Sequence, residues 1–163
     1  MITSPHKTKV LNAFLDALTS ELKTMKDFAR SANEDATHEE AQSEDKHDTR
    51  AIEAAYLAKG QAKRVNDLEA TLREFQKLLE SPPQQRDRVS SGCLVKYECD
   101  GEILESLFST FGGGTRIEFE SKIIQIINPH SPLGEALEGL KVGEEVTFET
   151  KNHDKNYRIL EIN

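Results

Sequence analysis

The sequence predicts an α+β protein in which an N-terminal antiparallel α-helical coiled-coil hairpin precedes a small α+β domain with a mainly antiparallel sheet. Two heptad seams, one on each side of an acidic bend, predict the hairpin. Short β-type runs broken by turns predict the second domain. The 31% charged fraction and the absence of Trp argue against one thick core. We therefore expect a hairpin over 1–81, a linker over 82–89 and the second domain over 90–163.

The two seams alternate spacings of three and four residues, which is typical of packed helices. The first consists of Leu11, Leu15, Leu18, Leu22, Met25, Ala29 and Ala32. The second consists of Ala51, Ala55, Ala58, Ala62, Val65, Leu68, Leu72, Phe75 and Leu79. About 29 helical residues on each side predict an arm roughly 43 Å long. The alanines nearest the bend predict close helix approach and a slender tip.

The ends of the hairpin carry ordinary helix signals. Pro5 suits the first turn of the first helix, and the Ser81-Pro82-Pro83 run stops the second, because proline lacks the amide. Beyond the linker we expect a short helix over 131–137, capped by Ser131. The expected strands are 92–99, 102–108, 116–127, 145–150 and 157–162.

Composition limits the classes of function. With a formal net charge of -8, the chain should be repelled by bare duplex DNA. Without an apolar run of roughly 20 residues, we expect no membrane association and a cytoplasmic location. Cys93 and Cys99 are separated by six positions of a predicted strand, about 20 Å, so we expect reduced thiols.

The bend between the helices concentrates acidic residues. Carboxylates crowded at the end of a long arm suggest a device for holding a metal ion, whereas the plainer interpretation is a solvated acidic turn. His38 and His47 flank the carboxylates, so the tip could instead bind Zn²⁺ or Mn²⁺ on its own. The calcium-loop spacing is not met. The acids are Glu34, Asp35, Glu39, Glu40, Glu44, Asp45 and Asp48.

Three carboxyl-terminal segments, 128–137, 142–146 and 157–162, read NPHSPLGEAL, VGEEV and YRILEI. In order and spacing they resemble signatures of the bacterial Gre-type transcript cleavage factors, the family of GreA and GreB. Residues 65–72 are similar to the family's second coiled-coil helix. The resemblance implies an FKBP-like second domain that docks outside RNA polymerase while the coiled coil enters the secondary channel. It also implies a monomer acting on the nascent RNA 3′ end.

At the tip, the family carries Asp, two residues, then Glu-Asn, and the closest match here runs from Asp45 to Asp48-Thr49. The resemblance implies that Asp45 and Asp48 assist catalysis and share Mg²⁺ with the polymerase, with none bound by the isolated protein. Counting back without gaps from Val65 favours Glu44 as the first acid instead. This sequence has Asp where the family has Glu and Thr where the family has Asn, which changes the reach and the orientation of these two side chains.

Two further sites follow from the resemblance. Lys59, Lys63 and Arg64 would grip displaced RNA, although such clusters also occur as solvated coiled-coil flanks paired with acids. The loop formed by Ser131, Pro132 and Leu133 would dock on the polymerase, and its residues are also those of an ordinary helix start. Gly112-Gly113-Gly114 lacks the Lys and Ser/Thr of a phosphate loop and predicts a flexible hairpin turn.

The leading hypothesis is an accessory transcription elongation factor, not itself an enzyme, that stimulates the polymerase's cleavage of backtracked RNA. An alternative is a channel-binding regulator that blocks or modulates transcription without stimulating cleavage. Because the implied second domain is FKBP-like, a prolyl isomerase is a further alternative. Fold alone does not carry that activity, and the active pocket of FKBP-type isomerases includes a Trp, which this chain lacks. A plain coiled-coil adaptor would leave the acidic tip without a purpose.

Overall fold

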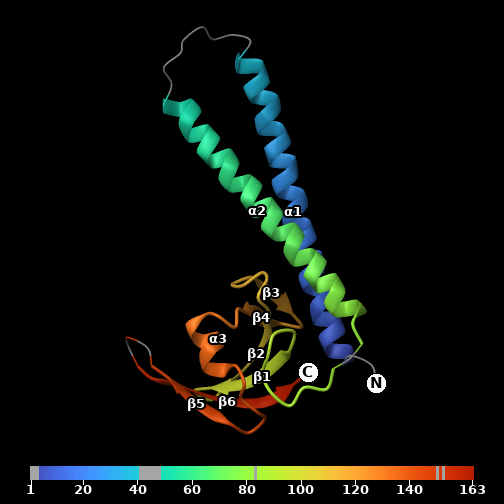
Figure 1. Ribbon diagram of the computed structural model, residues 1–163, viewed down its shortest axis with the longest axis vertical. Helices are drawn as coiled ribbons and strands as arrows, with labels where there is room; N and C mark the ends of the chain where they lie inside the picture. Colours follow the sequence, from blue (N-terminus) through green and yellow to red (C-terminus); the bar gives the residue numbers. More distant parts are fainter. Residues whose placement is uncertain (1–3, 41–48, 83, 150, 152) are drawn as a thin grey trace.

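The chain forms a long two-helix arm above a small sheet domain (Figure 1). The computed structural model describes residues 4–40, 49–82, 84–149, 151 and 153–163, with side chains described outside 32–53. The predicted fold class is confirmed. The elements are α1 (Pro5–Glu40), α2 (Thr49–Glu80), β1 (Leu94–Cys99), β2 (Glu102–Phe108), β3 (Arg116–Phe119), β4 (Lys122–Ile127), α3 (Pro132–Leu137), β5 (Glu145–Phe148) and β6 (Lys155–Ile162).

Both arm helices are longer than predicted. Helix α1 has 36 residues and α2 has 32, so they extend about 54 and 48 Å at 1.5 Å per residue. Near the sheet their seams pack as expected, because Leu11, Leu18, Leu68 and Phe75 are all at most 2% exposed. The rings of Phe14 and Phe75 meet edge to face across the arm, with centroids 6.1 Å apart.

The prediction of a slender, closely packed tip is wrong for the described part of the arm. Ala55, Ala58 and Ala62 are exposed, and the helices diverge away from the sheet (Figure 1). An alanine methyl buries little apolar area, so these positions contribute weakly to helix pairing compared with the leucines and phenylalanines at the base. Spacing alone did not reveal this difference in strength.

The sheet has six strands in the order β3-β4-β2-β1-β6-β5. All neighbours are antiparallel except β2 and β4, which run parallel. The expected single strand over 116–127 is wrong, because Glu120 and Ser121 adopt positive φ values of 49° and 63° and form a tight turn between β3 and β4. Such turns usually carry Asn-Gly, and Glu-Ser is not a recognisable turn signal.

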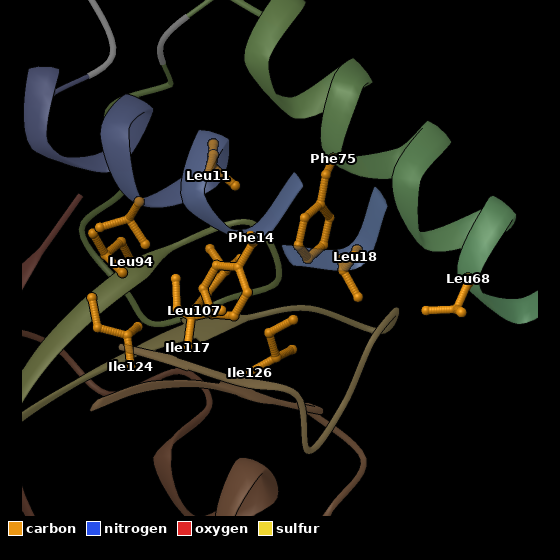
Figure 2. Close-up of a cluster of buried hydrophobic side chains, with 11 residues drawn as sticks. Leu11, Phe14, Leu18, Leu68, Phe75, Leu94, Leu107, Ile117, Ile124 and Ile126 are labelled. Carbon is orange, nitrogen blue, oxygen red and sulfur yellow. The ribbon is translucent and has the colours of Figure 1, made fainter. Parts of the chain in front are cut away.

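The sheet buries both of its faces. One face carries Leu94, Leu107 and Ile126, and the base of the arm covers it (Figure 2). The successive residues Val95, Phe108 and Ile127 point to the other face, which contacts α3. The first core contains Val10, Leu11, Phe14, Leu18, Leu68, Phe75, Leu94, Leu107, Ile117, Ile124 and Ile126.

The predicted domain boundaries stay a prediction, because the first core draws residues from both sides of them. The second core lies under α3 and contains both cysteines. Cys93 and Cys99 are buried and free.

Candidate functional site

Helix α1 ends at Glu40 and α2 begins at Thr49, so the predicted tip acids fall largely between the two helices in the sequence. Glu44, Asp45 and Asp48 lie outside the described residues, and so does His47. Their roles in metal binding and catalysis therefore stay predictions. Within the described part of the chain, no group of three or more His, Cys, Asp or Glu side chains could hold a metal ion.

The predicted RNA-binding residues lie on α2, on the part of the arm nearer the tip. Lys59 and Lys63 are exposed. Arg64 is paired instead, since its Nη2 donates to Oε1 of Glu21 on α1 at 2.7 Å. This is the interhelical pairing typical of a coiled-coil flank, so part of the positive charge of Arg64 is neutralised.

A second ion pair ties the same flanks together. Nζ of Lys26 donates to Oε1 of Glu69 at 2.6 Å, and this hydrogen bond lowers the pKa of the Glu69 carboxyl. Both pairs are solvent-exposed, so water screens them and each adds little stability. They join α1 and α2 below the diverging part of the arm.

The predicted docking loop forms a helix start, as its sequence indicated. Ser131 caps α3: its Oγ accepts a hydrogen bond from the Gly134 amide at 3.1 Å and donates to the Asn128 carbonyl at 2.7 Å. Pro132 occupies the first turn. Leu133 is half-buried against the second core, which leaves part of its side chain accessible. Docking itself stays a prediction.

The loop also requires glycine at position 134, and the sequence analysis did not identify this requirement. A Cβ at this position would overlap the Asn128 carbonyl oxygen and lie 2.8 Å from the Pro129 Cα. Because these are backbone atoms, they cannot move aside cheaply. The loop therefore depends on a residue without a side chain as well as on its Ser-Pro start.

Polar contacts join the arm to the sheet on one side, and no sequence motif indicates them. Nε2 of His6, in the first turn of α1, lies 3.0 Å from both carboxylate oxygens of Glu105 in β2. Glu105 is 9% exposed. Nearby, Nζ of Lys7 donates to the Asn163 carbonyl at 3.1 Å, and burial lowers the pKa of this lysine.

A glycine contact fixes the other side of the joint. Gly112, with φ of +71°, follows β2, and a Cβ there would lie 2.9 Å from Cγ2 of Thr71 on α2. Thr71 is 4% exposed and donates to the Asp67 carbonyl at 2.8 Å. Beside this contact lies a cleft of about 280 Å³ whose lining includes Arg64 and Phe111. These contacts hold α2 against the loop that follows β2.

These features define a class of protein: a two-helix arm carries an acidic tip, and a small mixed sheet anchors its base. Residues 84–163 match the family described as "Transcription elongation factor, GreA/GreB, C-term". This carboxyl-terminal domain therefore belongs to the GreA/GreB family of transcription elongation factors, as the sequence motifs predicted.

Three solved structures are similar to the chain. They are Thermus aquaticus Gfh1 (20% identity, TM-score 0.39, covering 93% of this chain and 94% of that chain), Thermus thermophilus Gfh1 (19%, 0.36, 91% and 94%) and GreA/GreB from Nitrosomonas europaea (17%, 0.35, 69% and 92%). No curated protein matches this chain. Among the described residues, no helix is long and apolar enough to cross a membrane.

Proposed function

We propose that this protein is an accessory factor of bacterial RNA polymerase that enters the secondary channel and stimulates the polymerase's own cleavage of backtracked RNA. The observation that carries the proposal is the GreA/GreB carboxyl-terminal domain at the base of a two-helix arm about 50 Å long. Such an arm can reach a buried active centre while its base stays outside.

At the tip, Asp45 and Asp48 would approach the polymerase's catalytic centre, with Glu44 as the rival for the first acid. Carboxylate oxygens are ligands that suit Mg²⁺, which in such a centre activates the attacking water and stabilises the leaving oxygen. Two added carboxylates would complete the ligand set and orient that water. The isolated protein supplies only part of this site, so we propose that it has no cleavage activity alone.

The rest of the surface has supporting roles in this proposal. Leu133, presented by the rigid Ser131 cap, would contact the polymerase outside the channel. Lys59 and Lys63 would contact the phosphates of displaced RNA, with Arg64 partly committed to Glu21. The double substitution Lys59→Glu/Lys63→Glu should therefore lower RNA cleavage without unfolding the arm. Unchanged cleavage would exclude the proposed RNA contact.

The tip sequence favours a second candidate function. Asp48 is one methylene shorter than the family's Glu, and Thr49 replaces its Asn. A tip with shorter reach would occupy the channel without completing the catalytic ligand set. The protein would then modulate transcription without stimulating cleavage.

One experiment separates these functions. A stalled, backtracked transcription complex with Mg²⁺ is incubated with the protein or with the Asp45→Asn/Asp48→Asn variant. We expect rapid loss of the RNA 3′ end with the parent protein alone. Glu34→Gln/Asp35→Asn is the matched control, since it removes the same charge from α1, and it should keep activity. Tight polymerase binding with no cleavage by the parent would establish the regulator.

A further inference from the structure

The sheet splits at the amino-terminal ends of its two parallel strands. Strand β2 pairs with β4 only from Glu105, which lies opposite Ile124, onward. In the described part of the chain, residues 102–104 of β2 pair with β1 alone, and residues 122–123 of β4 pair with β3 alone. A cleft of about 300 Å³ lies at this split, and we call it the split-sheet cleft. Its lining consists of Lys96, Ile103, Leu104, Glu105, Lys122 and Ile123.

Side chains on the arm-facing side of β2 lose their cover step by step toward the split-sheet cleft. Leu107, Glu105 and Ile103 lie on the same face because alternate residues of a strand share a face. Leu107 is fully buried in the core under the arm, Glu105 is 9% exposed where it meets His6, and Ile103 is 59% exposed. The cover that α1 provides therefore ends at its first turn, and the sheet face continues beyond it.

The cleft is apolar and accessible. Ile103 and Ile123 are each 59% exposed, and Leu104 is 37% exposed. Among the described residues, these are three of the eight large hydrophobic side chains that are exposed, and all three line this one cleft. A single exposed apolar side chain needs no explanation, whereas exposed apolar side chains gathered in one hollow mark a place where a partner binds.

The charged residues of the lining favour a partner with a carboxylate. Nζ of Lys96 donates to Oε2 of Glu161 at 2.9 Å, and the carboxylate of Glu105 contacts His6 at 3.0 Å. Lys122 is exposed and has no ion-pair partner within the described part of the chain. Its ammonium group is therefore the charge in the cleft that is left for a partner, and a carboxylate complements it.

The backbone at the cleft is placed to pair with an extended segment. Just after β2, the Ser109 amide donates to the Ile127 carbonyl of β4 at 3.0 Å. Because backbone groups alternate in direction along a strand, every second residue before Ser109 also points toward β4, and the last of these is Ile103. Its amide and carbonyl lie beyond the pairing with β4. Extended peptides add to open strand edges of this kind and place side chains in neighbouring pockets.

We propose that the split-sheet cleft binds an extended segment of the RNA polymerase surface that carries an apolar side chain next to a carboxylate. The apolar side chain packs between Ile103 and Ile123, the carboxylate meets Lys122, and the backbone of the segment pairs with Ile103. Polymerase as the partner rests on the proposed function, in which the base of the arm stays outside the channel. The cleft is then a second anchor, because Leu133 of the predicted docking loop packs against the other core.

The affinity of the full-length protein for bacterial RNA polymerase, measured by biolayer interferometry, tests this proposal. Ile123→Ser removes one apolar wall of the cleft, and Lys122→Glu reverses its unpaired charge. Each variant has a matched control in the same domain. Val142→Ser makes the same kind of change at a side chain that is 58% exposed, and Lys151→Glu reverses an exposed charge outside the cleft.

We expect each cleft variant to weaken polymerase binding by about 10-fold, and each control by less than about 2-fold. The effect of Lys122→Glu should shrink at high salt, because salt screens exposed charges. In the complex, hydrogen exchange of the Ile103 amide should slow by about 10-fold or more, since the amide gains a hydrogen-bond acceptor. Circular dichroism checks that each variant keeps its fold.

The outcomes separate this inference from the proposed function. Tight polymerase binding that neither cleft variant weakens would overturn the cleft and leave the proposed function standing. No binding by the parent protein would overturn both. Light scattering on the free protein covers a different occupant. A dimer that Ile123→Ser dissociates would assign the cleft to a second copy of this chain and overturn the polymerase segment.

Discussion

His6 is the residue that shows most directly how the arm is held on the sheet. Its ring nitrogen contacts both oxygens of Glu105, whose carboxylate is otherwise withdrawn from water. We predict that His6→Ala lowers the free energy of unfolding by about 1–3 kcal/mol, because it leaves a buried acceptor without its partner. Urea unfolding measures the change.

The double variant His6→Ala/Glu105→Gln provides the control for this prediction. A neutral amide costs less to bury unpaired than a carboxylate, so the double variant should recover part of the loss. Lys9→Ala, at an exposed position of the same helix, should change stability by less than about 0.5 kcal/mol. If His6→Ala matched Lys9→Ala, the contact would have no role in stability.

We predict that replacing glycine with alanine has opposite effects on stability at Gly134 and at Gly60. At Gly134 a Cβ would overlap the Asn128 carbonyl, so Gly134→Ala should destabilise the protein by about 1–3 kcal/mol. At Gly60 the space is open and the backbone is helical, so Gly60→Ala should stabilise the protein by about 0.5–1 kcal/mol. Thermal unfolding compares the two variants. Shifts of the unfolding temperature in the same direction would contradict the predicted difference between the two positions.

At the residue scale, local chemistry was predictable and distant contacts were not. The Ser131 cap and the Pro132 first turn follow from residues that are adjacent in sequence, and the structure confirms them. The His6–Glu105 contact joins residues 99 positions apart, and neither belongs to a recognisable motif. Which acids converge at the tip stays a prediction, because Glu44, Asp45 and Asp48 lie outside the described residues.

At the element scale, the β3–β4 hairpin carries residues unsuited to its turn. Glu120 and Ser121 both have positive φ, a conformation that Asn and Gly adopt more easily. We predict that Glu120→Asn/Ser121→Gly raises the free energy of unfolding by up to about 1 kcal/mol. Urea titration measures it. Glu118→Asn, which removes the same charge from β3, is the control and should give no gain.

The same hairpin shows what the sequence could not reveal about elements. Residues 116–127 carry β-type residues throughout, and without a turn signal they read as one strand. The arm gives the opposite case, because regular spacing correctly located both helices but overstated how closely Ala55 and Ala58 pack. Periodicity identifies the face of a helix, whereas the size of the side chains decides how strongly that face is buried.

At the scale of the whole molecule, the shared core was the main feature missed. Paired apolar residues such as Leu94-Val95 and Leu107-Phe108 send one side chain to each face of the sheet, so both faces need a cover. Only α3 was expected to provide one. The second cover is the arm itself, and its Phe14 is fully buried although it lies outside the predicted seam.

This shared core predicts that the base of the arm and the sheet unfold together. Phe14→Ala removes a fully buried ring that contacts Phe75 and lies in the core with Leu107 and Ile117 (Figure 2). We predict a loss of about 3–5 kcal/mol in the free energy of unfolding. Helix content at 222 nm and protection of sheet amides from hydrogen exchange should be lost at the same, lower urea concentration.

Ile103→Ala is the control for this last prediction, because Ile103 is 59% exposed and its truncation leaves no cavity in either core. It should leave the urea midpoint nearly unchanged. If Phe14→Ala lowered the helix transition while the sheet amides kept their protection, the arm and the sheet would be independent units. The direction of the arm would then not be fixed by the core. A single shifted transition would instead mean that the sheet sets that direction, because the arm's base cannot leave the sheet without unfolding it.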